Sequence, residues 1–131
     1  MVEGLLLSLW IAGGLFKLVL CESVLMDGRL GCGVGWCMLG SVLMVGVLLN
    51  YHASVAHDAA VGDYGVLAPY ATLGGFARVG ADVFLGLHAS VGPGRQVGDR
   101  SKVSANSCAL ADVPADTLVY GVPGRHGPLF S

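Results

Sequence analysis

The chain has 131 residues, which is enough for one domain with a real core and too few for two independent cores. With 7 basic and 9 acidic residues the formal net charge is −2 and no basic run is present, which argues against nucleic acid or an anionic membrane as a partner. Only 12% of the residues are charged, 54% are hydrophobic and 21 are glycine, an unusual mixture for a soluble globular domain.

The first 24 residues carry the dense apolar block of the chain, LLLSLWIAGGLFKLVL, from Leu5 to Leu20. The block includes Lys17 and falls short of the roughly 20 apolar residues that a membrane-spanning helix needs. Glu3 stands where a secretory signal would carry a basic residue, so a signal peptide is a poor fit. We expect residues 1–24 to form a buried apolar cap, with a membrane-associating anchor as the less favoured alternative.

A repeat of six residues organises the chain from Leu25 to about Ala109. One track of aliphatic residues recurs without a slip at Val55, Val61, Leu67, Leu73, Val79, Leu85, Val91, Val97 and Val103. The same track extends backward through Leu49, Leu43, Cys37 and Leu25, with a gap at Gly31. Four residues after each aliphatic the side chain is small or β-branched, and Arg95 alone breaks this second track. Because the two tracks are independent, chance in a valine- and leucine-rich chain does not explain them.

A period of six fits neither an α-helix nor a meander of hairpins. One short strand and one corner in each hexad would direct the long aliphatic inward and the small residue into the crowded interior. Three hexads then close a triangular coil of about 18 residues. We therefore predict an all-β, left-handed parallel β-helix of nearly five coils over residues 25–110, capped by residues 1–24. Residues 111–131, with Pro114 and Pro123, are predicted to be an exit segment and an extended tail, of which the last residues, 126–131, are expected to be loose.

The coil length places His57 near a corner of this helix. It lies two residues after the inward Val55 and is expected to project outward, with Gly75 and Pro93 above it. An imidazole followed by Asp58 has the composition of a general base and the carboxylate that orients it. Neighbouring strand residues point to opposite faces, so contact between the two side chains requires corner geometry. The alternative is a solvated surface histidine.

His52, Tyr70 and His88 are predicted to form a column on successive coils, with Asn106 above them. We expect solvated histidines here, with a role in the wall of a substrate cleft as the alternative. His52 and His88 would be roughly 9–10 Å apart, too far to share an ion within one chain. A metal held between subunits is a weaker alternative, and no metal is expected.

The cysteines show no CxxC spacing and no second pair, so neither a zinc site nor a thioredoxin-type motif is supported. They are Cys21, Cys32, Cys37 and Cys108. Free, buried thiols in a reducing cytoplasm are the favoured interpretation.

Three stretches of the sequence resemble one family of enzymes. They are LLNYHASVAHDAAVGDYGVLAPYATLGG, RVGADVFLGLHASVGPGRQVG and DVPADTLVYGVPGR. The N-x-H-x-x-V-x-H-D phrase, followed by G-D-Y and A-P, and the G-x-P-x-R exit are its most particular features. Over about residues 25–125 the chain resembles the bacterial hexapeptide-repeat acetyltransferases of the sialic-acid O-acetyltransferase type. That group includes enzymes that N-acetylate amino sugars on nucleotide carriers.

This resemblance implies a homotrimer with acetyl-CoA, the co-substrate, lying in a groove along the coils. It implies that His57 is the general base and that Asp58 tunes it. The backbone that would hold the pantetheine arm of CoA lies at Gly86, Leu87 and Ala105. Arg125 would meet a phosphate of CoA, or would be a solvated arginine of the tail.

The chain departs from the family in two ways. Val66 stands where the family commonly has a histidine, and 24 residues are too few for the βαβ sugar-nucleotide-binding unit that usually precedes the helix. The function predicted from the sequence is transfer of an acetyl group from acetyl-CoA directly to an oxygen or nitrogen of a sugar or sugar nucleotide. The alternative is a non-catalytic trimeric scaffold or a degenerate fragment.

Overall fold

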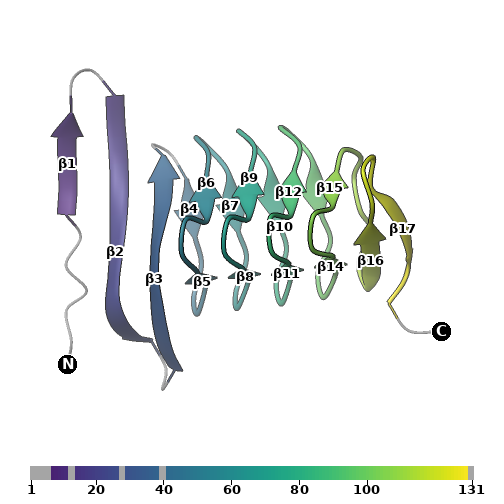
Figure 1. Ribbon diagram of the computed structural model, residues 1–131, viewed down its shortest axis with the longest axis horizontal. Coiled ribbons are helices and arrows are strands. Elements are labelled where there is room, and N and C mark those ends of the chain that lie inside the picture. The colour runs from purple at the N-terminus through teal and green to yellow at the C-terminus, as the bar shows by residue number, and fades with distance from the viewer. Residues whose placement is uncertain (1–6, 12–13, 27–28, 39–40, 130–131) are drawn as a thin grey trace.

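The structure, a computed structural model, describes residues 7–11, 14–26, 29–38 and 41–129, and the side chains of residues 41–129. Every regular element in these ranges is a β-strand, and the strands form three sheets that we call faces A, B and C (Figure 1). Within the same ranges, no helix could cross a membrane.

The strands of each face follow one another along the long axis of the molecule. Face A contains β1 (Leu7–Ile11), β2 (Gly14–Met26), β3 (Arg29–Met38), β6 (Ser54–Val55), β9 (Thr72–Leu73), β12 (Ser90–Val91) and β15 (Cys108–Ala109). Face B contains β4 (Val42–Leu43), β7 (Ala60–Val61), β10 (Arg78–Val79) and β13 (Gln96–Val97). Face C contains β5 (Leu48–Leu49), β8 (Val66–Leu67), β11 (Phe84–Leu85), β14 (Lys102–Val103), β16 (Thr117–Tyr120) and β17 (Arg125–Pro128).

The hexads form a parallel β-solenoid of about four turns, which confirms the predicted all-β solenoid class. Arg78 of β10, for example, pairs in parallel with Ala60 of β7 on one side and with Gln96 of β13 on the other. From β4 to β15 the chain visits faces B, C and A in turn, so each of these short strands pairs with the strand one coil away rather than with its neighbour in sequence.

The core is built from the two tracks that the sequence predicts. Val55, Leu67 and Leu85, the second residues of their strands, are buried. Most small residues of the second track, among them Ala53 and Ala77, are also buried. Each buried leucine or valine contributes about 1.5–3 kcal/mol relative to exposure, and the alanines leave room for them inside a narrow coil.

The amino-terminal part differs from the expected first coil. β2 pairs antiparallel with both β1 and β3, and the parallel ladder begins where β3 meets β6, at Trp36↔Ser54. Leu25, predicted to open the solenoid, lies in β2 and is paired with Leu30. The gap in the hexad at Gly31 marks this change, because no aliphatic residue anchors a coil there. Whether residues 1–24 form a buried cap stays a prediction, since their side chains lie outside the described part.

The prediction that the ladder ends after Ala109 is wrong. Val113 bridges Val97, and β16 pairs in parallel with β14, so a further coil closes over the core. Val103 and Val119 are 16 residues apart rather than 18, so the six-residue period does not continue into this shorter coil. Within this coil the hydroxyl of the buried Ser101 is hydrogen-bonded twice: its Oγ donates to the carbonyl of Pro114 (2.8 Å) and accepts from the amide of Thr117 (3.1 Å).

The predicted extended tail also has regular structure. β17 folds back and pairs antiparallel with β16, and it contains residues 126–128 of the segment expected to be loose. Residues 130 and 131 lie outside the described ranges.

Candidate active site

The edges of the solenoid, where one face turns into the next, carry the candidate residues. Each edge is a column of two-residue turns, and the second residue of nearly every turn has a left-handed backbone, with φ of 56° at Asp58 and 55° at His88. Aspartate, asparagine and histidine adopt this conformation more readily than most non-glycine residues. The A–B edge contains turns 57–58, 75–76 and 93–94, and the C–A edge contains turns 51–52, 69–70, 87–88 and 105–106.

At the A–B edge the corner brings the side chains of His57 and Asp58 together, as the sequence prediction required. His57 Nδ1 and Asp58 Oδ2 are 3.1 Å apart, and the two side chains are 50% and 52% exposed. A neutral imidazole that donates its Nδ1 proton to the carboxylate has its Nε2 lone pair free to accept a proton. The pair therefore has the hydrogen-bond arrangement of a general base with an orienting carboxylate.

The next coil fixes the other side of the imidazole. A Cβ atom placed on Gly75 would lie 2.6 Å from His57 Nε2, so glycine at this position leaves the ring its space. The Phe76 ring packs edge-on against the imidazole, with a centroid distance of 5.0 Å and an interplanar angle of 88°. The coil length predicts the glycine above His57 but not the contact of Phe76, although the same 18-residue spacing places Phe76 directly above Asp58.

At the C–A edge the predicted column of rings is present. Tyr70 stacks on His52 at 4.9 Å and on His88 at 4.8 Å, with interplanar angles of 18° and 4°. Because the phenol ring lies between the two imidazoles, the histidines cannot share an ion within this chain.

The structure does not bring His57 together with this column. The column and His57 lie at opposite edges of face A, and the five residues from His52 to His57 span about 15 Å at strand rise. One chain therefore presents two separate sets of candidate residues.

The predicted cofactor-binding backbone also lies at the C–A edge. Leu87 and Ala105 are exposed, and no acceptor among residues 41–129 takes their amide hydrogens. The carbonyl of Leu87 is already engaged by the amide of Asn106 at 2.8 Å. A Cβ on Gly86 would lie 2.7 Å from the Ala105 nitrogen, so glycine is required for the two coils to approach. The amides of Leu87 and Ala105 are thus open donors at this edge.

Two equivalent amides at the third edge, between faces B and C, are capped by aspartates of the next coil. Asp63 accepts from the amide of Val45 at 3.1 Å, and Asp99 accepts from the amide of Ala81 at 2.9 Å. The amides of Leu87 and Ala105 have no such cap, and among the described residues neither do those of Asp63 and Asp99. Donors of this kind suit a ligand that carries amide carbonyls.

Two other predicted residues lie away from both edges. Arg125 begins β17 and is paired with Tyr120, so it belongs to the final hairpin, and its predicted contact with a phosphate stays a prediction. Cys108 is free but partly exposed rather than buried, because it is the outward residue of β15. The side chains of the other three cysteines lie outside the described residues.

Comparison with known proteins identifies similar folds. No protein-family model and no curated protein matches the sequence. A serine O-acetyltransferase with bacterial transferase hexapeptide repeats from Brucella melitensis is 33% identical, with a TM-score of 0.62. PerB from Caulobacter crescentus, solved in complex with CoA and GDP-perosamine, is 28% identical, with a TM-score of 0.61. The acetyltransferase domain of PglB from Neisseria gonorrhoeae is 25% identical, with a TM-score of 0.56.

The matches cover 68%, 71% and 70% of this chain but only 38%, 54% and 49% of those proteins, in the same order. The chain therefore spans about half, or less, of the length of the proteins it resembles. Within that part, it has a fold similar to the hexapeptide-repeat β-helix of acetyltransferases.

Proposed function

We propose that the chain is an acetyl-CoA-dependent acetyltransferase in which His57 is the general base. The observation that carries this proposal is the His57–Asp58 contact at a corner whose next coil keeps the imidazole in place through Gly75 and Phe76. The similar folds of acetyltransferases, one of them solved with CoA, support it.

The chemistry follows from the two nitrogens of His57. Nε2 takes the proton from the acceptor hydroxyl or amine as that group attacks the thioester carbonyl of acetyl-CoA. Asp58 accepts the Nδ1 hydrogen throughout and stabilises the imidazolium that forms. When the tetrahedral intermediate collapses, the carbon–sulfur bond breaks, and Nε2 returns the proton to the departing thiolate. Acetyl transfer is direct, with no covalent enzyme intermediate.

The amide carbonyls in the pantetheine arm of acetyl-CoA would accept hydrogen bonds from the open amides of Leu87 and Ala105. Face A separates the two edges by about 15 Å, and Leu87 and Ala105 lie further from His57 still because they belong to later coils. A complete site therefore requires the A–B edge of one copy beside the C–A edge of another. A cyclic homotrimer repeats such a head-to-tail contact and closes it. The ring column of His52, Tyr70 and His88 would then line the cleft.

For the acceptor we propose a sugar or nucleotide-linked sugar, on the strength of the N-x-H-x-x-V-x-H-D phrase, with acetylation at oxygen or nitrogen. PerB, with its bound GDP-perosamine, is consistent with this class. The Brucella melitensis protein is a serine O-acetyltransferase, so L-serine is the second acceptor to test. A cytoplasmic location, where acetyl-CoA is available and thiols stay reduced, accompanies the proposal.

The test follows release of CoA thiol from acetyl-CoA with a panel of amino sugars, hydroxy sugars, their nucleotide forms and L-serine. Replacement of the base in His57→Ala is expected to lower the rate by about 10²–10⁴-fold. His126→Ala, which removes an exposed histidine of the final hairpin, is the matched control and should retain the rate.

If wild-type protein forms a trimer that CoA stabilises against heat but releases no thiol with any acceptor, the acceptor-binding part is incomplete in this chain. If CoA gives neither stabilisation nor release, the proposal fails and the non-catalytic scaffold is the better description.

A further inference from the structure

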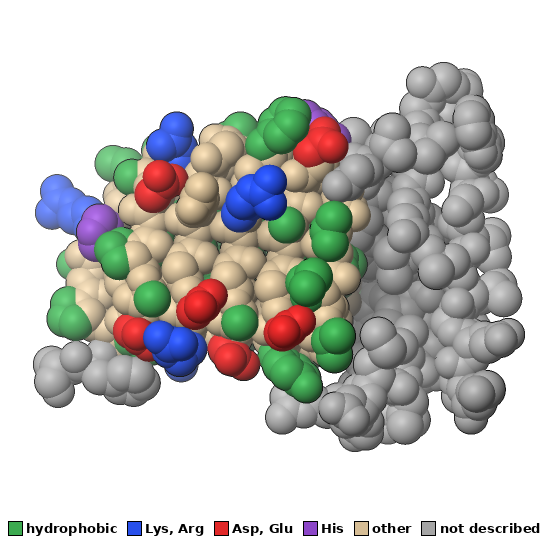
Figure 2. Space-filling model, turned by 180° about the vertical axis from the view of Figure 1, so that it is seen from behind, with side chains coloured by type: hydrophobic (Ala, Val, Ile, Leu, Met, Phe, Trp, Pro, Cys, Tyr) green, Lys and Arg blue, Asp and Glu red, His purple; other side chains and the backbone are tan. Residues whose placement is uncertain are grey.

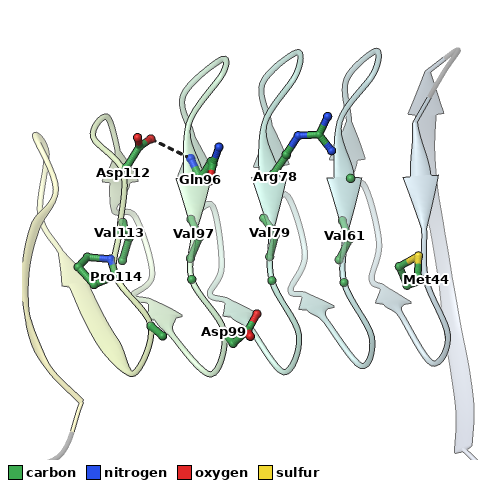
Figure 3. Close-up of a pocket in the computed structure, with 15 residues that line it drawn as sticks. Met44, Val61, Arg78, Val79, Gln96, Val97, Asp99, Asp112, Val113 and Pro114 are labelled. Carbon is green, nitrogen blue, oxygen red and sulfur yellow. Dashed lines mark hydrogen bonds between the residues drawn. The ribbon is translucent and has the colours of Figure 1, made fainter.

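A groove of about 650 Å³ lies over face B and extends toward the B–C edge (Figure 3). Its floor is formed by the outward residues Ala60, Arg78 and Gln96 and by the backbone of their strands. Met44 closes one end, and Pro114 closes the other. The lining is largely apolar and uncharged, so any charge within it stands out.

Arg78 is a cation without an anionic partner in this groove. Asp112, at one end, accepts from the amide of Gln96 at 3.0 Å and pairs with Arg95 at 3.8 Å. Asp99, at the lower rim, caps the amide of Ala81. Among residues 41–129 no carboxylate lies within ion-pair distance of Arg78. On the face seen in Figure 2, acidic and basic side chains are interspersed and form no basic patch.

Among the residues that line the groove, Ala60 and Arg78 lie on the side nearer the A–B edge, which carries the proposed base. Ala60 lies three residues after His57 and pairs in register with Arg78 one coil above. Arg78 in turn follows Phe76, whose ring contacts the imidazole, by two residues. In Figure 3 the Arg78 side chain extends along the face toward β7. Strand rise and coil spacing put an anion paired with Arg78 about 10 Å from the imidazole.

We infer that this groove binds the acceptor and that Arg78 pairs with an anionic group of it, a carboxylate or a phosphate. The inference rests on the proposed function, because it takes His57 as the base. A guanidinium suits both anions, since it can form two parallel hydrogen bonds to either. The distance of about 10 Å between this anion and the His57 imidazole favours the acceptor over acetyl-CoA. An amino-acid carboxylate, or the diphosphate of a nucleotide-linked sugar, lies within about 10 Å of the reacting atom. The phosphates of CoA lie farther away, beyond the extended pantetheine arm.

Kinetics of two variants test the assignment. Arg78→Gln should raise KM for an anionic acceptor by about 10–100-fold, the usual effect of losing a charge-assisted hydrogen bond, and Arg78→Lys should raise it less. KM for acetyl-CoA, and the rate with an uncharged sugar of the same class, should not change. Lys102→Gln, which removes an exposed cation from face C, is the matched control. A rise in KM for acetyl-CoA alone, or no change in either KM, would overturn the inference.

A binding measurement separates this inference from the proposed function. GDP and L-serine serve as phosphate and carboxylate probes, guanosine as the neutral control and CoA as the donor, each titrated by calorimetry. We expect GDP or L-serine to bind wild type and Lys102→Gln at least 10-fold more tightly than Arg78→Gln, with no such difference for guanosine or CoA. If that pattern appears without turnover, the anion site stands while the proposed function fails. If neither anion binds wild type, or if only CoA binding depends on Arg78, the site is wrong whether or not turnover occurs.

Discussion

Gly75→Ala tests whether the space beside His57 Nε2 is part of the catalytic geometry. A Cβ at this position would lie 2.6 Å from Nε2 and 2.8 Å from Cε1. Carbon atoms and ring atoms make favourable contact at about 3.5–4.0 Å, so the imidazole must move by about 1 Å or rotate away. Misplacement of a catalytic group by about 1 Å costs up to ~10²-fold in rate. The backbone tolerates the change, because Gly75 does not have a left-handed φ.

The expected result is therefore a loss of rate without a loss of stability. CoA thiol release should fall by about 10²-fold, while the free energy of unfolding stays within about 1 kcal/mol of wild type, since Gly→Ala at a compatible φ is mildly stabilising. Gly127→Ala is the control, because a Cβ there meets nothing within 4 Å. In a His57→Ala background the Gly75→Ala change should have no further effect on rate, because both act through the same imidazole.

Two results would refute this reasoning. A Gly75→Ala variant with the wild-type rate would show that the imidazole does not need its observed position. An equal further loss in the His57→Ala background would show that the alanine acts on something other than the imidazole.

Three further predictions concern stability. Leu85→Ala empties a fully buried position (0% exposed) and should lower the free energy of unfolding in urea by about 2–5 kcal/mol; less than 1 kcal/mol would contradict the packed core. Tyr70→Ala removes two stacked ring contacts, each ~0.5–1.5 kcal/mol, so thermal unfolding should show a clear loss relative to Tyr120→Ala. The hydrogen bonds from Arg100 to Asp116 (2.7 and 2.8 Å) hold the pKa of that carboxyl below its ordinary value of 3.8. Wild type should thus exceed Asp116→Asn in stability above pH 4, and the difference should vanish as pH falls through the lowered pKa. A difference that persists in strong acid would show that the ion pair is not its cause.

The hexads predicted most of the fold because a period of six leaves few alternatives. An inward aliphatic such as Leu67 and a small partner such as Ala71 can both be buried only if each hexad turns the same corner. The two ends were less predictable. At Gly31 the repeat loses its anchor, and at Val119 it resumes after a coil two residues short. Pairing partners across such interruptions depend on the whole sheet and not on local sequence.

For the candidate site, too, the sequence predicted some features and not others. The coil length alone placed Gly75 over His57 and aligned Tyr70 with its two histidines, and only the structure shows that the rings of this column stack. The edge-on contact of Phe76 was not predicted, because it depends on the direction in which a left-handed corner residue projects.

The sequence by itself determined the repeat, the inward residues and the coil in which each candidate side chain lies, because these depend only on spacing along the chain. Only the tertiary structure decided that His57 touches Asp58, that His57 and His52 occupy opposite edges of one face, and that Arg78 has no carboxylate partner among residues 41–129. The physical reason is that these properties depend on corner dihedrals and on neighbours one coil away. A one-dimensional pattern gives the order of such neighbours but not the direction of their side chains.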